Sequence, residues 1–143
     1  MPANFWDGTL GQMPHLTLEY SKNLGSVAPS APLFATLHGV LESVAGISVD
    51  NCKSRWREVS DFHVGAGGED KAFVHLSIRY LEGRPPATQH AVGEAVLRML
   101  KEHFKEALGD LDLQITVEIE DIRRDTYFKD PPGTLGRPPT LQV

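Results

Sequence analysis

Cysteine, basic charge and long apolar runs are all scarce in this sequence. Cys52 is the single cysteine among 143 residues, which excludes an internal disulfide framework and a multi-cysteine zinc site and favours a reducing compartment. The 14 Lys and Arg residues are outnumbered by 19 Asp and Glu residues, and the net charge of -5 argues against a general nucleic-acid or anionic-membrane surface. No apolar run approaches the roughly 18 residues that a membrane span requires.

The amino-terminal segment also lacks the marks of a secretory signal. It has neither a basic segment nor an apolar stretch. We therefore expect a cytoplasmic protein that has no nucleic-acid or membrane partner. With 41% apolar and 23% charged residues, the chain can build one hydrophobic core and has the length of one ordinary domain.

Apolar residues recur with two different periods along the chain, one typical of strands and one typical of helices. We expect strands at residues 15–20, 52–64, 71–81 and 112–121, and helices at residues 30–46 and from about 86 to 108. In the first helix, Ser30 is a suitable N-cap, Pro32 suits the first turn and Gly46 suits the end. The repeated order of strand, helix and strand is typical of tandem βαβ units.

Two βαβ halves, at about 14–64 and 70–121, predict an α/β (α+β) fold with a four-stranded sheet and two helices on one face. The strands within each half should be parallel, because a crossover helix joins them. Oligomerisation is an economical way to cover the other face of the sheet. Residues 1–12 are interpreted as an amino-terminal extension. For the Pro- and Gly-rich arm at 130–143, an ordered contact with a neighbouring subunit and disorder both stay open.

Three cations stand at every second position in the second expected strand. Lys53, Arg55 and Arg57 should therefore share one face of that strand. Three adjacent cations repel one another and call for an anion, and arginine matches a carboxylate by a two-pronged hydrogen bond. An exposed edge strand with basic residues that discourage aggregation explains the spacing equally well.

Other chemistry-bearing residues favour structural roles. No pair among the six histidines has a metal-binding spacing, so we expect no metal site. The glycine-rich turn at 65–68 is followed by a strand rather than a helix, which favours a hairpin turn over a phosphate loop. Cys52 lacks the local signature of a nucleophile, and Glu118 and Glu120 fit a solvated strand face.

Several short motifs occur in a characteristic order along the chain. They are Met13–Leu24, Lys53–Arg55, Glu69–Leu76, Gly83–Arg84, His103–Phe104, Glu118–Glu120 and Phe128–Lys129. In order and spacing these motifs resemble the 5-carboxymethyl-2-hydroxymuconate Δ-isomerase family of the tautomerase superfamily. The resemblance spans roughly residues 13–129, which we interpret as the tautomerase-like domain.

The resemblance implies two fused βαβ units, a homotrimer and a catalytic amino-terminal proline. It also implies an enzyme that needs no metal and no cofactor and moves a proton between carbons of a small unsaturated keto or enol carboxylic acid. Pro14 matches the catalytic proline. Arg55 and Arg84 match residues expected to bind the substrate carboxylate, and Lys53 stands where the family commonly has arginine, keeping the charge without the planar fork.

The chemistry of such a proline requires a free amine. A terminal proline nitrogen has a lone pair, and burial and nearby cations bring its pKa towards neutrality, where an acid–base catalyst is efficient. In this sequence other residues precede Pro14, and within a peptide bond its lone pair is delocalised.

Three explanations stay open for the residues that precede Pro14. In the first, translation begins at Met13, and removal of that methionine frees Pro14. In the second, the chain begins at Met1 and the extension is cut later. In the third, the extension stays, and the protein is a catalytically silent trimer that binds a small anion or serves as an assembly module.

Overall fold

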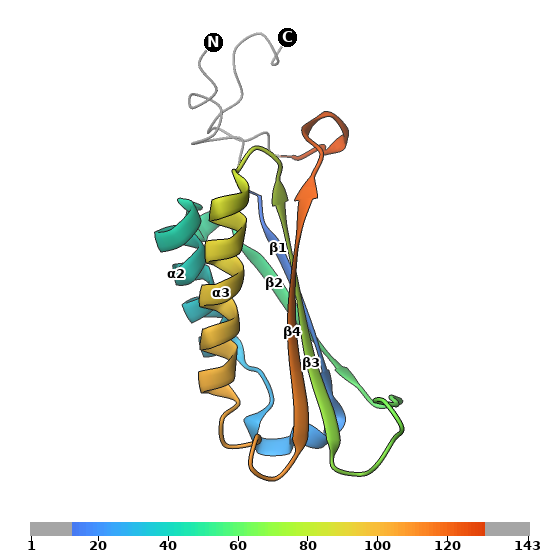
Figure 1. Cartoon of the computed structure of the whole chain (residues 1–143). Coiled ribbons are helices and arrows are strands. Elements are labelled where there is room, and N and C mark those ends of the chain that lie inside the picture. Colours follow the sequence, from blue (N-terminus) through green and yellow to red (C-terminus); the bar gives the residue numbers. More distant parts are fainter. Residues whose placement is uncertain (1–12, 131–143) are drawn as a thin grey trace, which may run out of the picture.

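A computed structural model describes residues 13–130, which form a sheet covered on one face by two helices (Figure 1). The strands are β1 (His15–Ser21), β2 (Lys53–Val59), β3 (Lys71–Leu81) and β4 (Asp112–Ile122). The helices are α2 (Ala31–Ala45) and α3 (Pro86–His103), and the short 3-10 helices are η1 (Lys22–Val27), η2 (Val49–Asn51) and η3 (Arg124–Thr126). The expected four-stranded sheet with two helices on one face is thus confirmed. Both predicted arms lie outside the described residues, apart from Asp130.

The strands follow the order β2-β1-β3-β4. Within each half the pairing is parallel, β1 with β2 and β3 with β4, as the crossover helices predict. The two halves meet through an antiparallel pair, β1 with β3, at the centre of the sheet. As a result, β1 and β2 begin at the same end of the sheet at which β3 and β4 finish.

Alternation along the strands separates a core face from a polar face. In β1, Leu16 and Leu18 are fully buried beneath the helices, while their neighbours Thr17 and Glu19 point to the open side. Both helices contribute an apolar stripe at helical spacing to the same core. The buried residues of the two helices are Leu33, Phe34, Leu37, Leu41, Val92, Val96 and Leu100.

Two predicted boundaries were wrong at their carboxyl ends. The strand expected to reach residue 64 ends at Val59, and a bend and turns occupy the following segment. The helix expected to reach residue 108 ends at His103. Phe104 and Ala107 remain buried, but the backbone beyond the helix makes three-residue turns, such as the 3.0 Å bond from the Ala107 N–H to the Phe104 carbonyl. Apolar spacing therefore persists beyond the point where the backbone leaves the α-helix.

The first helix follows its sequence signals closely. Ser30 occupies the N-cap position, although its side chain accepts no capping hydrogen bond. Gly46 ends the helix in the left-handed conformation, with φ 69°, which a residue without a Cβ adopts at little cost.

Within residues 13–130, no helix is long and apolar enough to cross a membrane.

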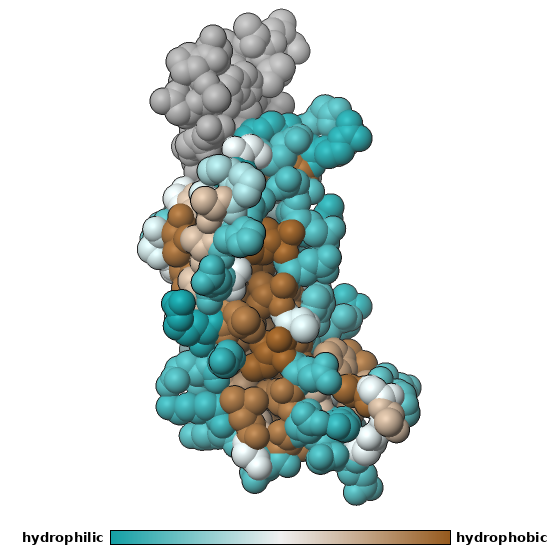
Figure 2. Space-filling view, viewed as in Figure 1, coloured by the Kyte–Doolittle hydropathy of each residue, from teal (hydrophilic) through white to brown (hydrophobic). Residues whose placement is uncertain are grey.

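The open face of the sheet is polar, whereas apolar residues gather along the edge formed by α3 and β4. Figure 2 shows this apolar band between the two elements. Leu113, Ile115, Val117 and Ile119 of β4 pack against the core but are only partly buried, and Leu97 of α3 is exposed. An uncovered apolar edge of this kind suits contact with another protein surface.

Candidate active site

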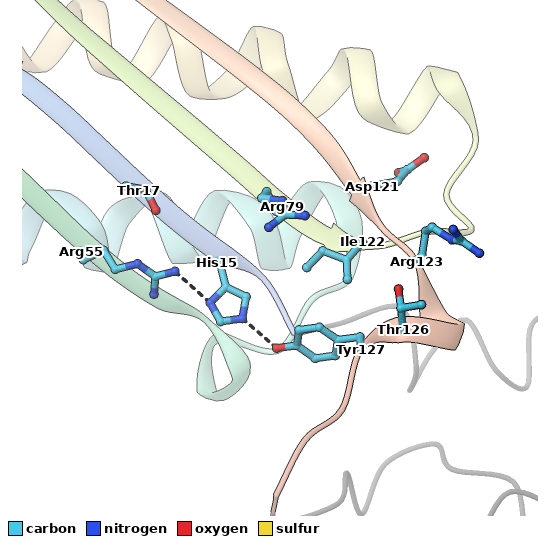
Figure 3. Close-up of a pocket in the computed structure, with 9 residues that line it drawn as sticks. All are labelled: His15, Thr17, Arg55, Arg79, Asp121, Ile122, Arg123, Thr126 and Tyr127. Carbon is cyan, nitrogen blue, oxygen red and sulfur yellow. Dashed lines mark hydrogen bonds between the residues drawn. The ribbon is translucent and has the colours of Figure 1, made fainter.

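A pocket of about 550 Å³ lies on the polar side of the sheet, at the end where β1 begins and β3 and β4 finish. Because those three strand ends meet there, residues far apart in the sequence face one cavity (Figure 3). The pocket is lined by His15, Thr17, Arg55, Arg79, Asp121, Ile122, Arg123, Thr126 and Tyr127. Arg55, which the sequence predicts as a binding residue, is among them.

Cationic side chains outnumber carboxylates in this pocket. Arg55 of β2, Arg79 of β3 and Arg123 face it against one carboxylate, that of Asp121. Arg123 forms a 2.8 Å ion pair with Asp125. Within residues 13–130, neither Arg55 nor Arg79 forms an ion pair with a carboxylate, so both guanidinium groups can serve an anion from solution.

His15 links two walls of the pocket through its two ring nitrogens. Arg55 approaches the Nδ1 atom at 3.2 Å, and the hydroxyl of Tyr127 lies 2.7 Å from the Nε2 atom. Figure 3 shows the three side chains as one row. Burial, together with the positive charges of Arg55, Lys53 and Arg79, lowers the pKa of His15 below its ordinary value of 6.5. The ring is therefore mostly neutral at pH 7.

The lowered pKa has a consequence for stability. Burial also lowers the pKa of His38, whose Nε2 atom lies 2.7 Å from the Ser54 hydroxyl. Both histidines bind protons less readily in the folded protein than in the unfolded chain. The free energy of unfolding should therefore fall as the pH drops below 6.5, through the window between the unfolded and folded pKa values. Urea unfolding at pH 7.5 and pH 5.5, followed by circular dichroism, measures this loss.

Carboxylates also contribute to the loss of stability at low pH. The contribution of the two histidines is therefore measured by comparing the wild type with a variant that lacks them. The double variant His15→Gln with His38→Gln should lose less stability than the wild type between the same two pH values. An equal or steeper loss in the variant would contradict the assignment of the loss to these two rings.

Pro14 is buried immediately before β1, next to the pocket-lining His15. Its carbonyl accepts a 3.1 Å hydrogen bond from the backbone N–H of Lys53, which fixes its position at the start of the β1–β2 pair. In the described chain its nitrogen is joined to Met13. The Met13 side chain is buried in a small cluster with Leu81 and Ile122.

Met13 adopts an unfavourable backbone conformation. Its φ of 65° lies in the left-handed region, which is strained for a residue with a long side chain. Burial of the side chain against Leu81, Ile122 and the neighbouring Tyr127 offsets this cost. The residue that acylates the Pro14 nitrogen thus occupies space beside the pocket wall.

Lys53 and Arg84, like Pro14, are not among the residues that line this pocket. Lys53 is exposed at the start of β2, and its Nζ atom donates to the Asn51 carbonyl at 3.4 Å. Arg84 lies on the helix side of the sheet, where its Nε donates to the Ala45 carbonyl at 3.2 Å and its guanidinium stands 4.9 Å from the centre of the Tyr80 ring. Within one chain, Arg55 contacts His15, the residue that follows Pro14, whereas Arg84 is not among the residues that line the pocket.

Sequence reasoning missed most of the pocket. Arg79 alternates with the buried residues of β3, and it faces His15 only because β1 and β3 pair antiparallel in one register. Tyr127 follows η3 in a segment without periodicity, so no pattern marks it. His15 belongs to one of the family-like motifs, but an isolated histidine carries no functional signal of its own.

Alternative chemical centres find little support in the described part of the chain. Burial raises the pKa of the Cys52 thiol to about 11, which keeps it protonated and unreactive at neutral pH. Within residues 13–130, no group of three or more His, Cys, Asp or Glu side chains is arranged to hold a metal ion. Glu118 is exposed, and its Oε1 atom lies 3.5 Å from Nε2 of His75, outside the pocket.

Comparison with known proteins gives one consistent picture. A family model described as 5-carboxymethyl-2-hydroxymuconate isomerase matches residues 14–132. A 5-carboxymethyl-2-hydroxymuconate Delta-isomerase from Escherichia coli is 27% identical over 117 residues, which are 82% of this chain and 93% of the relative. The crystal structure of a 5-carboxymethyl-2-hydroxymuconate isomerase from Deinococcus radiodurans R1 is 29% identical and superposes with a TM-score of 0.77, covering 89% of this chain and 93% of that one.

A more distant structure shares the fold alone. It is described as a fused 4-OT wild-type symmetric trimer, is 17% identical and has a TM-score of 0.63 over 85% of this chain and 94% of that chain. The likeness therefore extends beyond close relatives to a wider group with the same tandem βαβ architecture.

Proposed function

This chain belongs to the 5-carboxymethyl-2-hydroxymuconate isomerase family, and we propose that it moves a proton between carbons of a small unsaturated keto or enol carboxylic acid. The observation that carries this proposal is the cationic pocket, which adjoins Pro14 through His15. A dicarboxylate resembling 5-carboxymethyl-2-hydroxymuconate suits its excess of guanidinium groups. The proposed reaction is an isomerisation, and the proposal requires no metal and no cofactor.

In the proposed reaction, Pro14 acts as base and then as acid. Its free amine takes a proton from one carbon, the C–H electron pair moves into a dienolate, and the same nitrogen returns the proton to a different carbon. The burial of Pro14 and the nearby positive charges support this role, because both disfavour the ammonium form and bring the pKa of a secondary amine towards neutrality.

The cationic residues divide into those that face the pocket and those that do not. We assign Arg55 to the substrate carboxylate because it lines the pocket, and Lys53 to a supporting charge at the same strand end. Arg84 is assigned to substrate binding by its match to the family motif. Its contacts with the Ala45 carbonyl and the Tyr80 ring lie outside the pocket of its own chain, so we propose that Arg84 serves the pocket of another protomer.

We further propose a homotrimer of this chain. The apolar edge of α3 and β4 supports it, and a structure of the same fold is described as a symmetric trimer. The proposed organisation is an extension at 1–12, a tautomerase-like domain at 13–129 and an arm at 130–143. The single cysteine supports a cytoplasmic location.

Replacement of Pro14 by alanine tests the proposed base. Every helix and strand of the described residues lies within residues 15–126, so a chain that begins at residue 14 retains the sequence of all of these elements. Such a chain should convert 2-hydroxymuconate to its keto form, with Pro14 taking the proton of the enol hydroxyl and returning it to a carbon. Loss of the dienol absorbance measures the rate. Pro14→Ala keeps a terminal amine, but a primary and more hydrated one, and kcat should fall by about tenfold or more.

Two outcomes would contradict the proposal. Equal rates for the wild-type chain that begins at Pro14 and for its Pro14→Ala variant would remove the special role of proline. A wild-type chain that begins at Pro14, folds and yet leaves all dienol acids unchanged would exclude the isomerase function itself.

A further inference from the structure

We propose that Tyr127 is a catalytic hydrogen-bond donor to the enol or dienolate oxygen of the substrate, and that His15 is the residue that positions its hydroxyl. The inference rests on the proposed function and adds a residue to its mechanism. It begins from the row formed by Arg55, His15 and Tyr127 (Figure 3).

The donor and acceptor atoms of the three side chains determine the direction of each hydrogen bond in this row. A guanidinium group has donors and no acceptor, so at 3.2 Å the Nδ1 atom of His15 must accept from Arg55. A neutral imidazole carries one N–H, which must then lie on Nε2. At 2.7 Å this N–H donates to the Tyr127 oxygen. The hydroxyl hydrogen of Tyr127 is consequently left for a different acceptor.

No acceptor for that hydrogen exists in the part of the chain that the structure describes, where His15 is the hydrogen-bond partner of the hydroxyl. The hydroxyl belongs to the pocket wall, together with Arg79 and Thr126. An oxygen atom of a bound molecule is therefore the acceptor that the geometry leaves open. An oxygen that carries negative charge is a stronger acceptor for this hydroxyl than solvent water is.

The position of Tyr127 also brings it close to the reacting centre. Its ring packs against the cluster of Met13, Leu81 and Ile122, and Met13 is the residue bonded to the Pro14 nitrogen. A chain that begins at Pro14 leaves the space of Met13 open between the amine and this wall. A substrate held there by Arg55 has its carbon chain near the amine and an oxygen within reach of Tyr127.

The hydrogen bond matters most when charge develops. As Pro14 removes the proton, from a carbon of a keto acid or from the enol hydroxyl of 2-hydroxymuconate, the electron pair of the broken bond leaves negative charge on the substrate oxygen. A donor already aimed at that oxygen stabilises the dienolate without reorganisation. Tyr127 keeps its proton throughout, and Pro14 returns the abstracted proton to the new carbon, so the substrate is isomerised with no net proton change.

His15 can hold this arrangement only in its neutral form. The charged groups that lower its pKa are Arg55 and Lys53 on β2 and Arg79 on β3, the Asp121 carboxylate lines the same pocket, and the Tyr127 hydroxyl lies 2.7 Å from Nε2. The positive charges and partial burial favour the neutral ring. A protonated ring would carry a hydrogen on Nδ1 facing the N–H donors of Arg55, and the hydrogen bond between His15 and Arg55 would be lost.

Two related compounds show whether Tyr127 donates a hydrogen bond to the substrate or only lines the pocket. 2-Hydroxymuconate carries the oxygen, and muconate is the same dicarboxylate without it. In chains that begin at Pro14, Tyr127→Phe should lower kcat/KM for 2-hydroxymuconate by about tenfold to a hundredfold. Competitive inhibition by muconate should change less than about twofold, because muconate offers no oxygen to the hydroxyl.

A double variant tests the positioning role of His15. His15→Phe should lower kcat/KM by a factor similar to that of Tyr127→Phe, and the two changes together should cost little more than either alone. The control is His75→Gln, which removes a histidine of the same sheet face that is 2.6 Å from Thr116 and outside the pocket. This control should retain wild-type kinetics. Nitrogen-15 shifts of His15 in the full chain should show the proton on Nε2.

The inference is overturned if Tyr127→Phe leaves turnover unchanged, if muconate inhibition weakens equally, or if His15 carries its proton on Nδ1. These outcomes are distinct from failure of the proposed function, in which the wild-type chain that begins at Pro14 would itself be inactive. In that case equilibrium binding decides the inference: Tyr127→Phe should weaken binding of 2-hydroxymuconate at least about fivefold and leave muconate binding unchanged. Equal binding of 2-hydroxymuconate by both chains would overturn it.

Discussion

A chain that retains residues 1–12 should isomerise 2-hydroxymuconate at least about 100-fold more slowly than the same protein beginning at Pro14. Within a peptide bond, the lone pair of the Pro14 nitrogen is delocalised and accepts no proton. Loss of the general acid–base group removes a factor of about 10² to 10⁴. Met13 adds a steric block, because it is buried with Leu81 and Ile122 beside the pocket.

The measurement compares the chain that retains residues 1–12 with the chain that begins at Pro14. The two have the same sequence from Pro14 onwards. Steady-state rates are measured after intact-mass analysis has established the first residue of each preparation, including the protein from its native host. A full chain with activity equal to that of the chain beginning at Pro14 would exclude the terminal amine as the base. If the native protein keeps its extension and binds muconate without turning over dienol acids, the anion-binding module replaces the isomerase as its function.

Replacing Arg55 by alanine should lower kcat/KM for 2-hydroxymuconate by about 100-fold or more. The change removes one of the two guanidinium groups that line the pocket without a carboxylate partner in the described chain. It also removes the donor that holds His15 in one tautomer, so Tyr127 loses its orientation. Arg55→Lys should restore only part of the rate, because an ammonium group keeps the charge without the planar fork.

Arg57 provides a matched control for this prediction. It lies two residues further along the same face of β2, beside Glu19 and outside the pocket. Arg57→Ala removes an equal charge from the same strand and should change kcat/KM by less than about threefold, since an exposed charge at this distance is screened by salt. Similar losses in the two variants would show that the strand acts through its overall charge and that Arg55 makes no specific contact.

The fold was largely predictable because local patterns and the global arrangement agree. Leu16 and Leu18 alternate with polar residues, and the helix from Ala31 to Ala45 ends at the glycine that its sequence indicates. Parallel pairing within each half follows from the crossover helices. The same alternation correctly placed Arg55 and Arg57 on one face of a strand.

The pocket was much less predictable because it depends on register between distant segments. Arg79 meets His15 only through the antiparallel pairing of β1 with β3, and Tyr127 reaches His15 across 112 positions of sequence. Neither contact leaves a local periodic signal. The helix end at His103 was missed for a related reason, since burial of Phe104 continued an apolar pattern that the backbone no longer followed.

The central antiparallel pair relates the two halves of the fold by an approximate two-fold symmetry, but the proposed catalytic amine can occur in only one half. A half-turn exchanges β1 with β3, and the residues before these strands, Pro14 and Asp70, occupy equivalent places at opposite ends of the sheet. Each accepts a backbone hydrogen bond from the first residue of its parallel partner strand, Lys53 for Pro14 at 3.1 Å and Asp112 for Asp70 at 2.7 Å. A polypeptide has a single amino terminus, so only the first half can present an amine. The duplicated architecture therefore yields a single catalytic centre per chain, and the equivalent end of the second half is free to diverge.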